Sequence, residues 1–251
     1  MPTEQINGID LYYESHGDGP AVTFLHGAGG NHISWWQQIP TFSQRYRCIV
    51  IDHRNFGRST DPTNEGDSRF VDDLAALLER FGIERTALVA QSMGGRTALG
   101  YAVRHPERVA ALAMCDTWGF FDWPELRERA AQLRDTDDQR PLENRALGPK
   151  YQDEHPRGTF LYQQIAALNP PRNINLNEGG PTRDEVATLR VPTLFLVGSE
   201  DAIVRPEVMR MMHELVPGSE YLEFPGCGHS VYFENSPAFN EAVGDFLAKR
   251  I

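Results

Sequence analysis

Two shortages in the sequence, of cysteine and of long hydrophobic runs, exclude several classes of protein. The chain holds three cysteines, Cys48, Cys115 and Cys227, and no two of them form a CxxC pair. An odd number of separated thiols argues against a disulfide framework. No apolar stretch approaches the roughly 20 residues of a membrane-spanning helix. The opening residues, MPTEQINGID, lack the basic start and apolar core of a secretory signal. We therefore expect a cytoplasmic location and no membrane partner.

Positive charge is also scarce. Lys and Arg number 24 against 35 Asp and Glu, which gives a formal net charge of -11. An acidic surface repels nucleic-acid phosphates and anionic lipid, so we expect no nucleic-acid partner. The eight histidines include no HExxH or comparable cluster, so we expect no bound metal. Hydrophobic residues make up 40% of the chain, which is typical of a folded globular protein.

Short apolar runs typical of buried strands alternate with segments that have helical spacing. The strand-like runs are residues 9–14, 21–25, 48–51, 87–89, 109–114, 193–197 and 221–224. The helix-like segments are residues 33–42, 68–81, 96–105, 207–215 and 238–247. This alternation predicts an α/β fold with a mostly parallel central sheet and helices on both faces. Asn7-Gly8 reads as a hairpin turn, which would add antiparallel strands at one edge of the sheet.

The stretch 118–189 interrupts the alternation. It is charged, helical in patches (124–133 and 159–168) and free of strand-like runs. We interpret it as a helical lid inserted after the sixth strand, with residues 1–117 and 190–251 forming the core. Insertions of this length are usually functional.

A hydroxyl, a carboxylate and an imidazole each follow the end of a strand-like run, in the order Ser92, Asp201, His229. In open α/β sheets, ligands bind beyond the carboxyl ends of the strands. A serine hydroxyl is a weak nucleophile unless a base takes its proton, and histidine suits that task near neutral pH. These residue types therefore indicate nucleophilic catalysis at this edge of the sheet.

Five short motifs resemble those of the α/β-hydrolase family, and together they span nearly the whole chain. HGAGG at 26–30 is similar to the family's HGxG oxyanion segment, and DHRNFGRS at 52–59 to its D-x-R-G-x-G-x-S turn. AQSMGG at 90–95 resembles the nucleophile elbow, G-x-S-x-G. GSED at 198–201 and GH at 228–229 match the positions of the acid and the base.

The elbow departs from the family pattern at one position, where Ala90 replaces the first glycine. The elbow needs small residues because its backbone is strained and its strand and helix pass close together. Ala90 adds only one methyl group, and Gly94 and Gly95 keep the clearance on the helix side. We therefore expect the elbow to form.

The resemblance implies a role for each residue of the site. Ser92 would be the nucleophile, His229 the base, and Asp201 the residue that holds the imidazole and stabilises its charged form. The backbone amides of Ala28 and Met93 would form the oxyanion hole. The implied activity is a serine hydrolase, similar to small esterases and enol-lactone hydrolases. Such an enzyme cleaves a small carboxylic ester or lactone through an acyl-enzyme intermediate and needs no cofactor.

Several residue assignments have alternatives. Ser92 could instead be a helix N-cap, and Asp116, which also follows a strand-like run, competes with Asp201 for the role of acid. Trp118 and Phe120 are our candidates for the walls of an aromatic substrate pocket. We expect His26 and His53 to be structural residues of their loops.

Two alternative activities keep the same fold. The serine C–C bond hydrolases of aromatic ring-fission pathways share the SMGG sequence, although they usually carry Asn where this chain has Gln91. A ligand sensor with slow turnover would also keep the three residues, because the fold by itself does not determine the substrate.

Overall fold

The computed structural model describes residues 3–135, 138–171, 174–176 and 178–251. Residues 1–2 of the predicted core, and residues 136–137, 172–173 and 177 of the predicted lid, lie outside the described residues.

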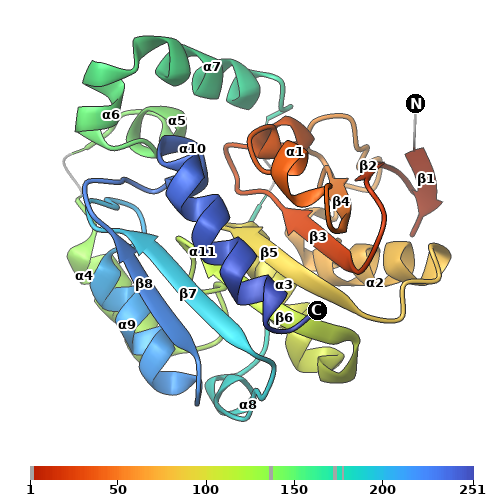
Figure 1. The fold of residues 1–251 in the computed structure, drawn as a ribbon. Coiled ribbons are helices and arrows are strands. Elements are labelled where there is room, and N and C mark those ends of the chain that lie inside the picture. The colour runs from red at the N-terminus through yellow and green to blue at the C-terminus, as the bar shows by residue number, and fades with distance from the viewer. Residues whose placement is uncertain (1–2, 136–137, 172–173, 177) are drawn as a thin grey trace.

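A single sheet runs through the molecule (Figure 1), and its described strands follow the order β1-β2-β4-β3-β5-β6-β7-β8. β1 pairs antiparallel with β2, and β2 pairs antiparallel with β4, whereas every later pair in that order is parallel. The predicted α/β fold with a mostly parallel sheet is confirmed. The strands are β1 (Thr3–Ile6), β2 (Ile9–His16), β3 (Ala21–Leu25), β4 (Arg47–Ile51), β5 (Thr86–Gln91), β6 (Val109–Cys115), β7 (Thr193–Gly198) and β8 (Glu220–Phe224).

The edge hairpin forms at the predicted turn. Asn7 and Gly8 both have positive φ, 47° and 80°, as a two-residue hairpin turn requires. These are residue types that adopt left-handed backbone at low cost.

Both faces of the sheet are covered, because alternate residues of a strand point to opposite sides. In β5, Leu88 and Ala90 belong to one core cluster, and Ala87 and Val89 belong to the other. The first cluster packs against α2 (Phe70–Arg80), α3 (Gly94–Arg104) and α9 (Pro206–Leu215). The second packs against α1 (Ile39–Phe42), α10 (Val231–Glu234) and α11 (Ser236–Ala248). Burial on both faces explains why the strands read as continuous apolar runs.

The prediction of one helix over residues 33–42 is wrong in detail. The chain forms a short 3-10 helix, η1 (His32–Trp35), and then begins the four-residue α1 with Pro40 in its first turn. Proline has no backbone N–H to donate to the preceding turn, so it starts a helix more readily than it continues one.

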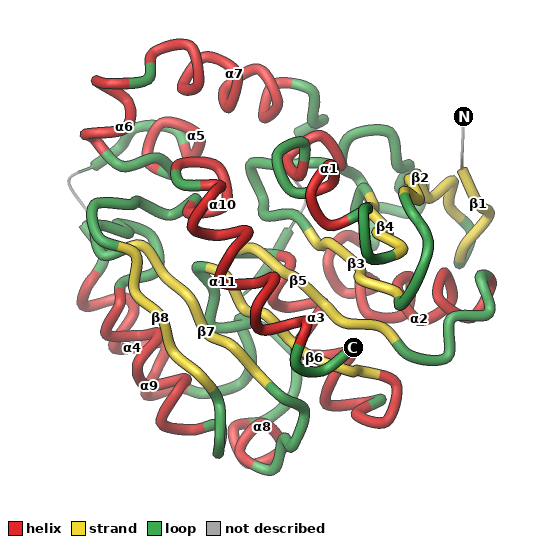
Figure 2. Tube along the Cα trace, viewed as in Figure 1, coloured by secondary structure: helices red, strands yellow, loops and turns green. Residues whose placement is uncertain are grey.

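Five helices lie between β6 and β7 in the described part of the chain: α4 (Pro124–Leu133), α5 (Leu142–Arg145), α6 (Pro149–Glu154), α7 (Pro156–Ala167) and α8 (Arg183–Ala187). Figures 1 and 2 show α5, α6 and α7 grouped beyond the ends of β7 and β8 to which the arrowheads point. α4 packs beside α9, and α8 lies toward the opposite end of the sheet. We call residues 142–167 the upper helices; the boundaries of the predicted lid stay a prediction.

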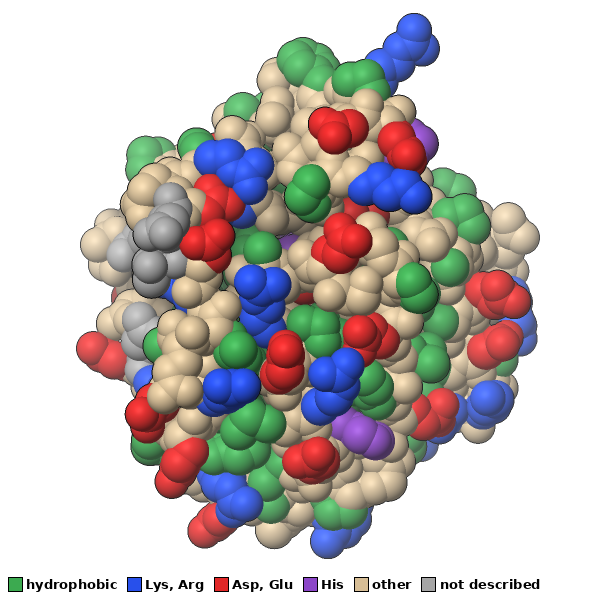
Figure 3. All heavy atoms as spheres, turned by 90° about the vertical axis from the view of Figure 1, so that its left-hand side faces the viewer, with side chains coloured by type: hydrophobic (Ala, Val, Ile, Leu, Met, Phe, Trp, Pro, Cys, Tyr) green, Lys and Arg blue, Asp and Glu red, His purple; other side chains and the backbone are tan. Residues whose placement is uncertain are grey.

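The surface carries charges of both signs. Figure 3 shows acidic and basic side chains interspersed over one face, with no basic patch on that face.

Within the described ranges, no helix combines the length and the apolar character needed to cross a bilayer.

One buried ion cluster joins α2 to the loop after β4. Arg54 is 1% exposed and binds Asp73 of α2 through two hydrogen bonds, of 2.9 and 2.8 Å. The third nitrogen of its guanidinium lies 3.3 Å from both Asp61 and Glu65. Asp73 is itself only 2% exposed, so the arginine brings the opposite charge to a buried carboxylate.

We predict that Arg54→Leu lowers the free energy of unfolding by about 3–5 kcal/mol, because it leaves a buried carboxylate without its partner. The matched control is Arg80→Leu, because Arg80 is exposed and pairs with Glu4 at the surface. That change should cost at most about 1 kcal/mol. Urea denaturation of both variants at neutral pH measures the difference, and equal losses would contradict the prediction.

Candidate active site

Ser92 lies in a tight turn between β5 and α3. Its φ of 48° is left-handed, which is unusual for a residue with a side chain. Its N–H donates to the carbonyl of Cys115 at 3.0 Å, and the N–H of Gly95 donates back to the Ser92 carbonyl at 2.9 Å. The N-cap of α3 is Met93, so the alternative that Ser92 caps this helix is not what the structure shows.

The turn fits because its neighbours are small. A Cβ on Gly94 would lie 2.2 Å from the carbonyl oxygen of Leu25, and one on Gly95 would lie 2.4 Å from the side chain of Thr117. Ala90 is fully buried and keeps its place in the sheet, so its extra methyl group is accommodated. The strand and the helix therefore approach as closely as an elbow requires.

Ser92, His229 and Asp201 form a continuous line of hydrogen bonds. The Ser92 hydroxyl lies 2.8 Å from Nε2 of His229, and Nδ1 of His229 lies 2.8 Å from Oδ2 of Asp201. Oδ1 of Asp201 accepts the backbone N–H groups of Ile203 and Val204, both at 2.8 Å. A carboxylate on Nδ1 favours the tautomer whose Nε2 can accept the serine proton. This arrangement can activate the hydroxyl.

Asp116, the rival acid, occupies a different position. It is fully buried, and its two oxygens accept the N–H groups of Gly198 at 3.0 Å and Val231 at 3.4 Å. Burial raises the pKa of this carboxyl well above its usual value, and the nearby Asp201 raises it further. In the described structure Asp201, not Asp116, is the carboxylate that contacts the imidazole.

The HGAGG loop packs directly against the elbow. A Cβ on Gly27 would lie 2.0 Å from Oε1 of Gln91 and 3.0 Å from Cβ of Ser92. The side chains of Ala28 and Met93 share one small buried cluster with two phenylalanines. The two predicted oxyanion donors thus come from segments that meet beside Ser92.

Two buried histidines hold this loop in place. Nδ1 of His26 lies 2.8 Å from the carbonyl of Gly27, and Nε2 of His26 accepts the backbone N–H of His53 at 3.0 Å. Nε2 of His53 lies 3.0 Å from the hydroxyl of Thr97. Burial lowers the pKa of His26 to about 4, and it also lowers the pKa of His53 well below its usual value. Both imidazole rings are therefore neutral, and both histidines act by holding the loop.

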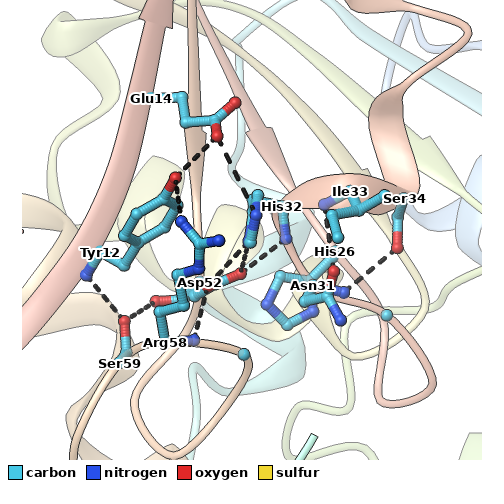
Figure 4. A network of polar contacts seen from close by, with 12 residues as sticks. Tyr12, Glu14, His26, Asn31, His32, Ile33, Ser34, Asp52, Arg58 and Ser59 are labelled. Atoms are coloured by element: carbon cyan, nitrogen blue, oxygen red, sulfur yellow. Dashed lines mark hydrogen bonds and ion pairs between the residues drawn. The ribbon is translucent and has the colours of Figure 1, made fainter. Parts of the chain in front are cut away.

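Asp52 anchors the neighbouring turn (Figure 4). Its carboxylate accepts the backbone N–H of His32 at 2.6 Å, the ring Nδ1 of the same residue at 2.9 Å and the N–H of Arg58 at 2.8 Å. The Ser59 hydroxyl donates to the Asp52 carbonyl at 2.7 Å and accepts the N–H of Tyr12 at 2.9 Å. These bonds tie η1 and the turn after β4 to strand β2.

In the described structure, the two predicted pocket walls make no hydrogen bond or ring contact with Ser92, Asp201 or His229. Trp118 is 6% exposed and stacks near Phe120 and Phe121, at ring-centroid distances of 4.8 and 6.0 Å. All three belong to or pack against the core cluster on the α3 side of the sheet. Their role as substrate contacts stays a prediction.

Sequence reasoning missed two residues that support the site. The side-chain amide of Gln91 donates to the His229 carbonyl at 2.9 Å. Its position next to Ser92 was a signal that could have identified it. The Tyr162 hydroxyl lies 2.9 Å from that of Ser230, beside the histidine. Tyr162 comes from α7, and no local pattern connects it to a loop 68 positions away.

Three kinds of comparison with known proteins, by family model, by sequence and by structure, are consistent with one another. The family model described as "alpha/beta hydrolase fold" matches residues 20–148 and 145–236. A putative carbamate hydrolase RutD of Caulobacter sp. is 28% identical over 95% of this chain and 96% of its own length. A 2-hydroxymuconate semialdehyde hydrolase of Pseudomonas sp. is 28% identical over 96% and 92%. The solved structure of a thermophilic esterase from Thermogutta terrifontis is 29% identical, with a TM-score of 0.85 over 98% of this chain and 96% of that one.

The buried histidines make stability depend on pH. The pKa of His26 falls from 6.5 to about 4 on folding, so the unfolded chain binds the extra proton between these values. Its stabilisation is therefore complete above about pH 6.5 and is lost as pH falls toward 4. We predict that lowering the pH from 7 to 5 destabilises the wild type more than His26→Asn, by about 2 kcal/mol.

Urea denaturation of both proteins at the two pH values measures this difference. The pKa of Asp116 is raised on folding, so this carboxyl changes stability with pH in the opposite direction. It is present in both proteins, so its contribution cancels in the difference between them. An identical pH dependence in the two proteins would show that His26 is not held neutral.

Proposed function

This chain belongs to the α/β-hydrolase fold family, and within that family we propose that it is a serine hydrolase acting on a small carboxylic ester or lactone. The observation that carries the proposal is the hydrogen-bonded line Ser92–His229–Asp201, with the serine on a left-handed elbow. The similarity to a thermophilic esterase over nearly the full length supports the choice of substrate class.

In the proposed mechanism His229 takes the proton of the Ser92 hydroxyl as the oxygen attacks the ester carbonyl. Asp201 stabilises the imidazolium that forms. The amides of Ala28 and Met93 would donate to the developing oxyanion, a contribution of about 10²–10³ in rate for each such donor. His229 then gives the proton to the leaving alkoxide, and the acyl group stays on the serine. Water, activated by the same histidine, hydrolyses the acyl-enzyme; in a lactone the alcohol remains attached to the acyl group throughout.

The surroundings of the serine favour an apolar acyl group. Ala28 and Met93 pack with the buried rings of Phe56 and Phe70. Leu142, from the upper helices, packs against the same cluster. A carbonyl held by the two amides would therefore have hydrocarbon on one side, which suits a neutral substrate. Trp118 and Phe120 remain candidate contacts for the rest of the substrate.

A second candidate is hydrolysis of a C–C bond in a ring-fission product. The 28% identity to a 2-hydroxymuconate semialdehyde hydrolase over 96% of the chain favours it. A panel of substrates assayed with one enzyme preparation distinguishes the two activities. It contains simple aryl esters and lactones for the first activity and a vinylogous diketone acid for the second.

We predict that a serine-directed fluorophosphonate labels the protein once, at Ser92. The His229→Ala variant should lose the label, because its serine has no base. The control is His16→Ala, which removes a partly exposed histidine at the end of β2. Mass spectrometry of intact protein and of peptides measures the label. An unlabelled, folded wild type would contradict the proposal and would favour the slow ligand sensor.

We predict that Asp201→Asn lowers kcat by about 10⁴, since an amide in place of the carboxylate permits the wrong tautomer of the imidazole. Asp116→Asn removes an equally buried carboxyl whose hydrogen bonds in the described structure come from backbone amides, so its effect on kcat should be much smaller. Steady-state kinetics on the best ester of the panel compares them. A larger loss in Asp116→Asn would assign the acid to Asp116.

A further inference from the structure

The backbone around His229 is held by two carboxylates that are not its hydrogen-bond partner. On one side, Glu234 accepts the N–H of Gly228 with its two oxygens at 3.1 and 3.0 Å. The N–H of Ser230 lies 3.4 Å from the same side chain. On the other side, the N–H of Val231 donates to Asp116 at 3.4 Å. Backbone amides of this loop are therefore bound by carboxylates both before and after His229 in the chain.

Glu234 also reaches the upper helices. Its Oε2 accepts the N–H of Gly148, the residue that caps α6, at 3.1 Å. Gly148 and Gly228 meet backbone to backbone, because a Cβ on Gly228 would lie 2.3 Å from the amide nitrogen of Gly148. Figure 1 shows α10 next to α5 and α6. One carboxylate thus joins the upper helices to the loop that carries the histidine.

A second contact ties the same two parts together. The Tyr162 hydroxyl of α7 lies 2.9 Å from the hydroxyl of Ser230, and its ring packs edge-to-face against Phe233 at a centroid distance of 5.1 Å. A Cβ on Gly29 would lie 3.7 Å from the Tyr162 hydroxyl, so this tyrosine also borders the oxyanion segment. The upper helices are therefore in contact with both the histidine loop and the oxyanion loop.

We propose that Glu234 is a positioning residue that couples the seating of the upper helices to the alignment of His229. The carboxylate has two oxygens and shares them between an amide of the upper helices and the amides that flank the histidine. The loop is then fully fixed only while α6 is in place over it. This inference rests on the proposed function, because it concerns the base of the proposed reaction.

Glu234→Gln tests the coupling with little change in shape. An amide has one acceptor oxygen and an NH₂ group that cannot accept. If its oxygen takes the place of Oε2, the bonds from Gly148 and Gly228 remain but the NH₂ group faces the N–H of Ser230. If its oxygen takes the place of Oε1, the bond from Gly148 is lost. We expect kcat per labelled Ser92 to fall about 10- to 100-fold, as for a displacement of the reacting groups by about 1 Å. KM should stay within about threefold, because the lost interaction acts on the chemical step. The matched control, Glu241→Gln, removes an exposed carboxylate of α11 and should leave both constants unchanged.

Gly148→Ala tests the same contact from the other side. Its Cβ would lie 2.9 Å from Oε2 of Glu234, so the methyl group pushes the upper helices away while both amides remain. We expect a similar fall in kcat. In the double variant the two losses should not add, because both act through one contact. Additive losses would overturn the coupling.

The experiment separates failure of this inference from failure of the proposed function. Stoichiometric fluorophosphonate labelling of the wild type establishes the nucleophile, and all rates are expressed per labelled serine. A labelled wild type together with an unchanged kcat in Glu234→Gln would overturn the coupling alone. An unlabelled wild type would overturn the proposed function. If Glu234→Gln does not fold, Gly148→Ala decides: reduced kcat at unchanged KM supports the coupling, and unchanged kcat contradicts it.

Discussion

The site depends on the left-handed backbone of Ser92. A non-glycine residue in this conformation costs roughly 1–2 kcal/mol relative to ordinary helical backbone. The surrounding structure maintains it, because β5 fixes the chain on one side and α3 begins at Gly94 on the other. The close approach of Gly94 to the Leu25 carbonyl leaves no space for a relaxed turn with a larger residue. The turn lifts the hydroxyl out of the sheet toward the loop that carries His229.

Three fully buried carboxylates at the carboxyl edge of the sheet each accept backbone amides. Asp52, Asp116 and Asp201 are all fully buried, and each accepts at least two backbone N–H groups. Each of these carboxylates contacts groups from more than one segment. These shared contacts hold together the loops at the carboxyl edge of the sheet. An unpaired buried charge would be costly, whereas amide donors satisfy it without bringing a second charge into the interior. This pattern explains how an acidic protein keeps several carboxylates near one imidazole.

The strand order and the strand ends explain how much the sequence could predict. Apolar runs and chain order placed Ser92, Asp201 and His229 at one edge of a parallel sheet, because carboxyl ends of parallel strands lie together. The split of residues 33–42 into η1 and α1 follows from Pro40, which is a local signal. Gln91 had a signal too, since it precedes Ser92 directly. Tyr162 and Glu234 had none, because their partners lie in loops whose meeting is decided by tertiary packing, which periodicity does not encode.

The residues of the proposed site come from parts of the chain that are far apart, since Ser92 and His229 are separated by 137 positions. The elbow itself is built from neighbouring residues, whereas His229 follows β8 and reaches the elbow through the pairing of β7 and β8 with the rest of the sheet. Contacts of such long sequence separation form late, because the chain entropy of closing the loop must be overcome first. The proposed nucleophile therefore meets its proposed base only in the completed topology.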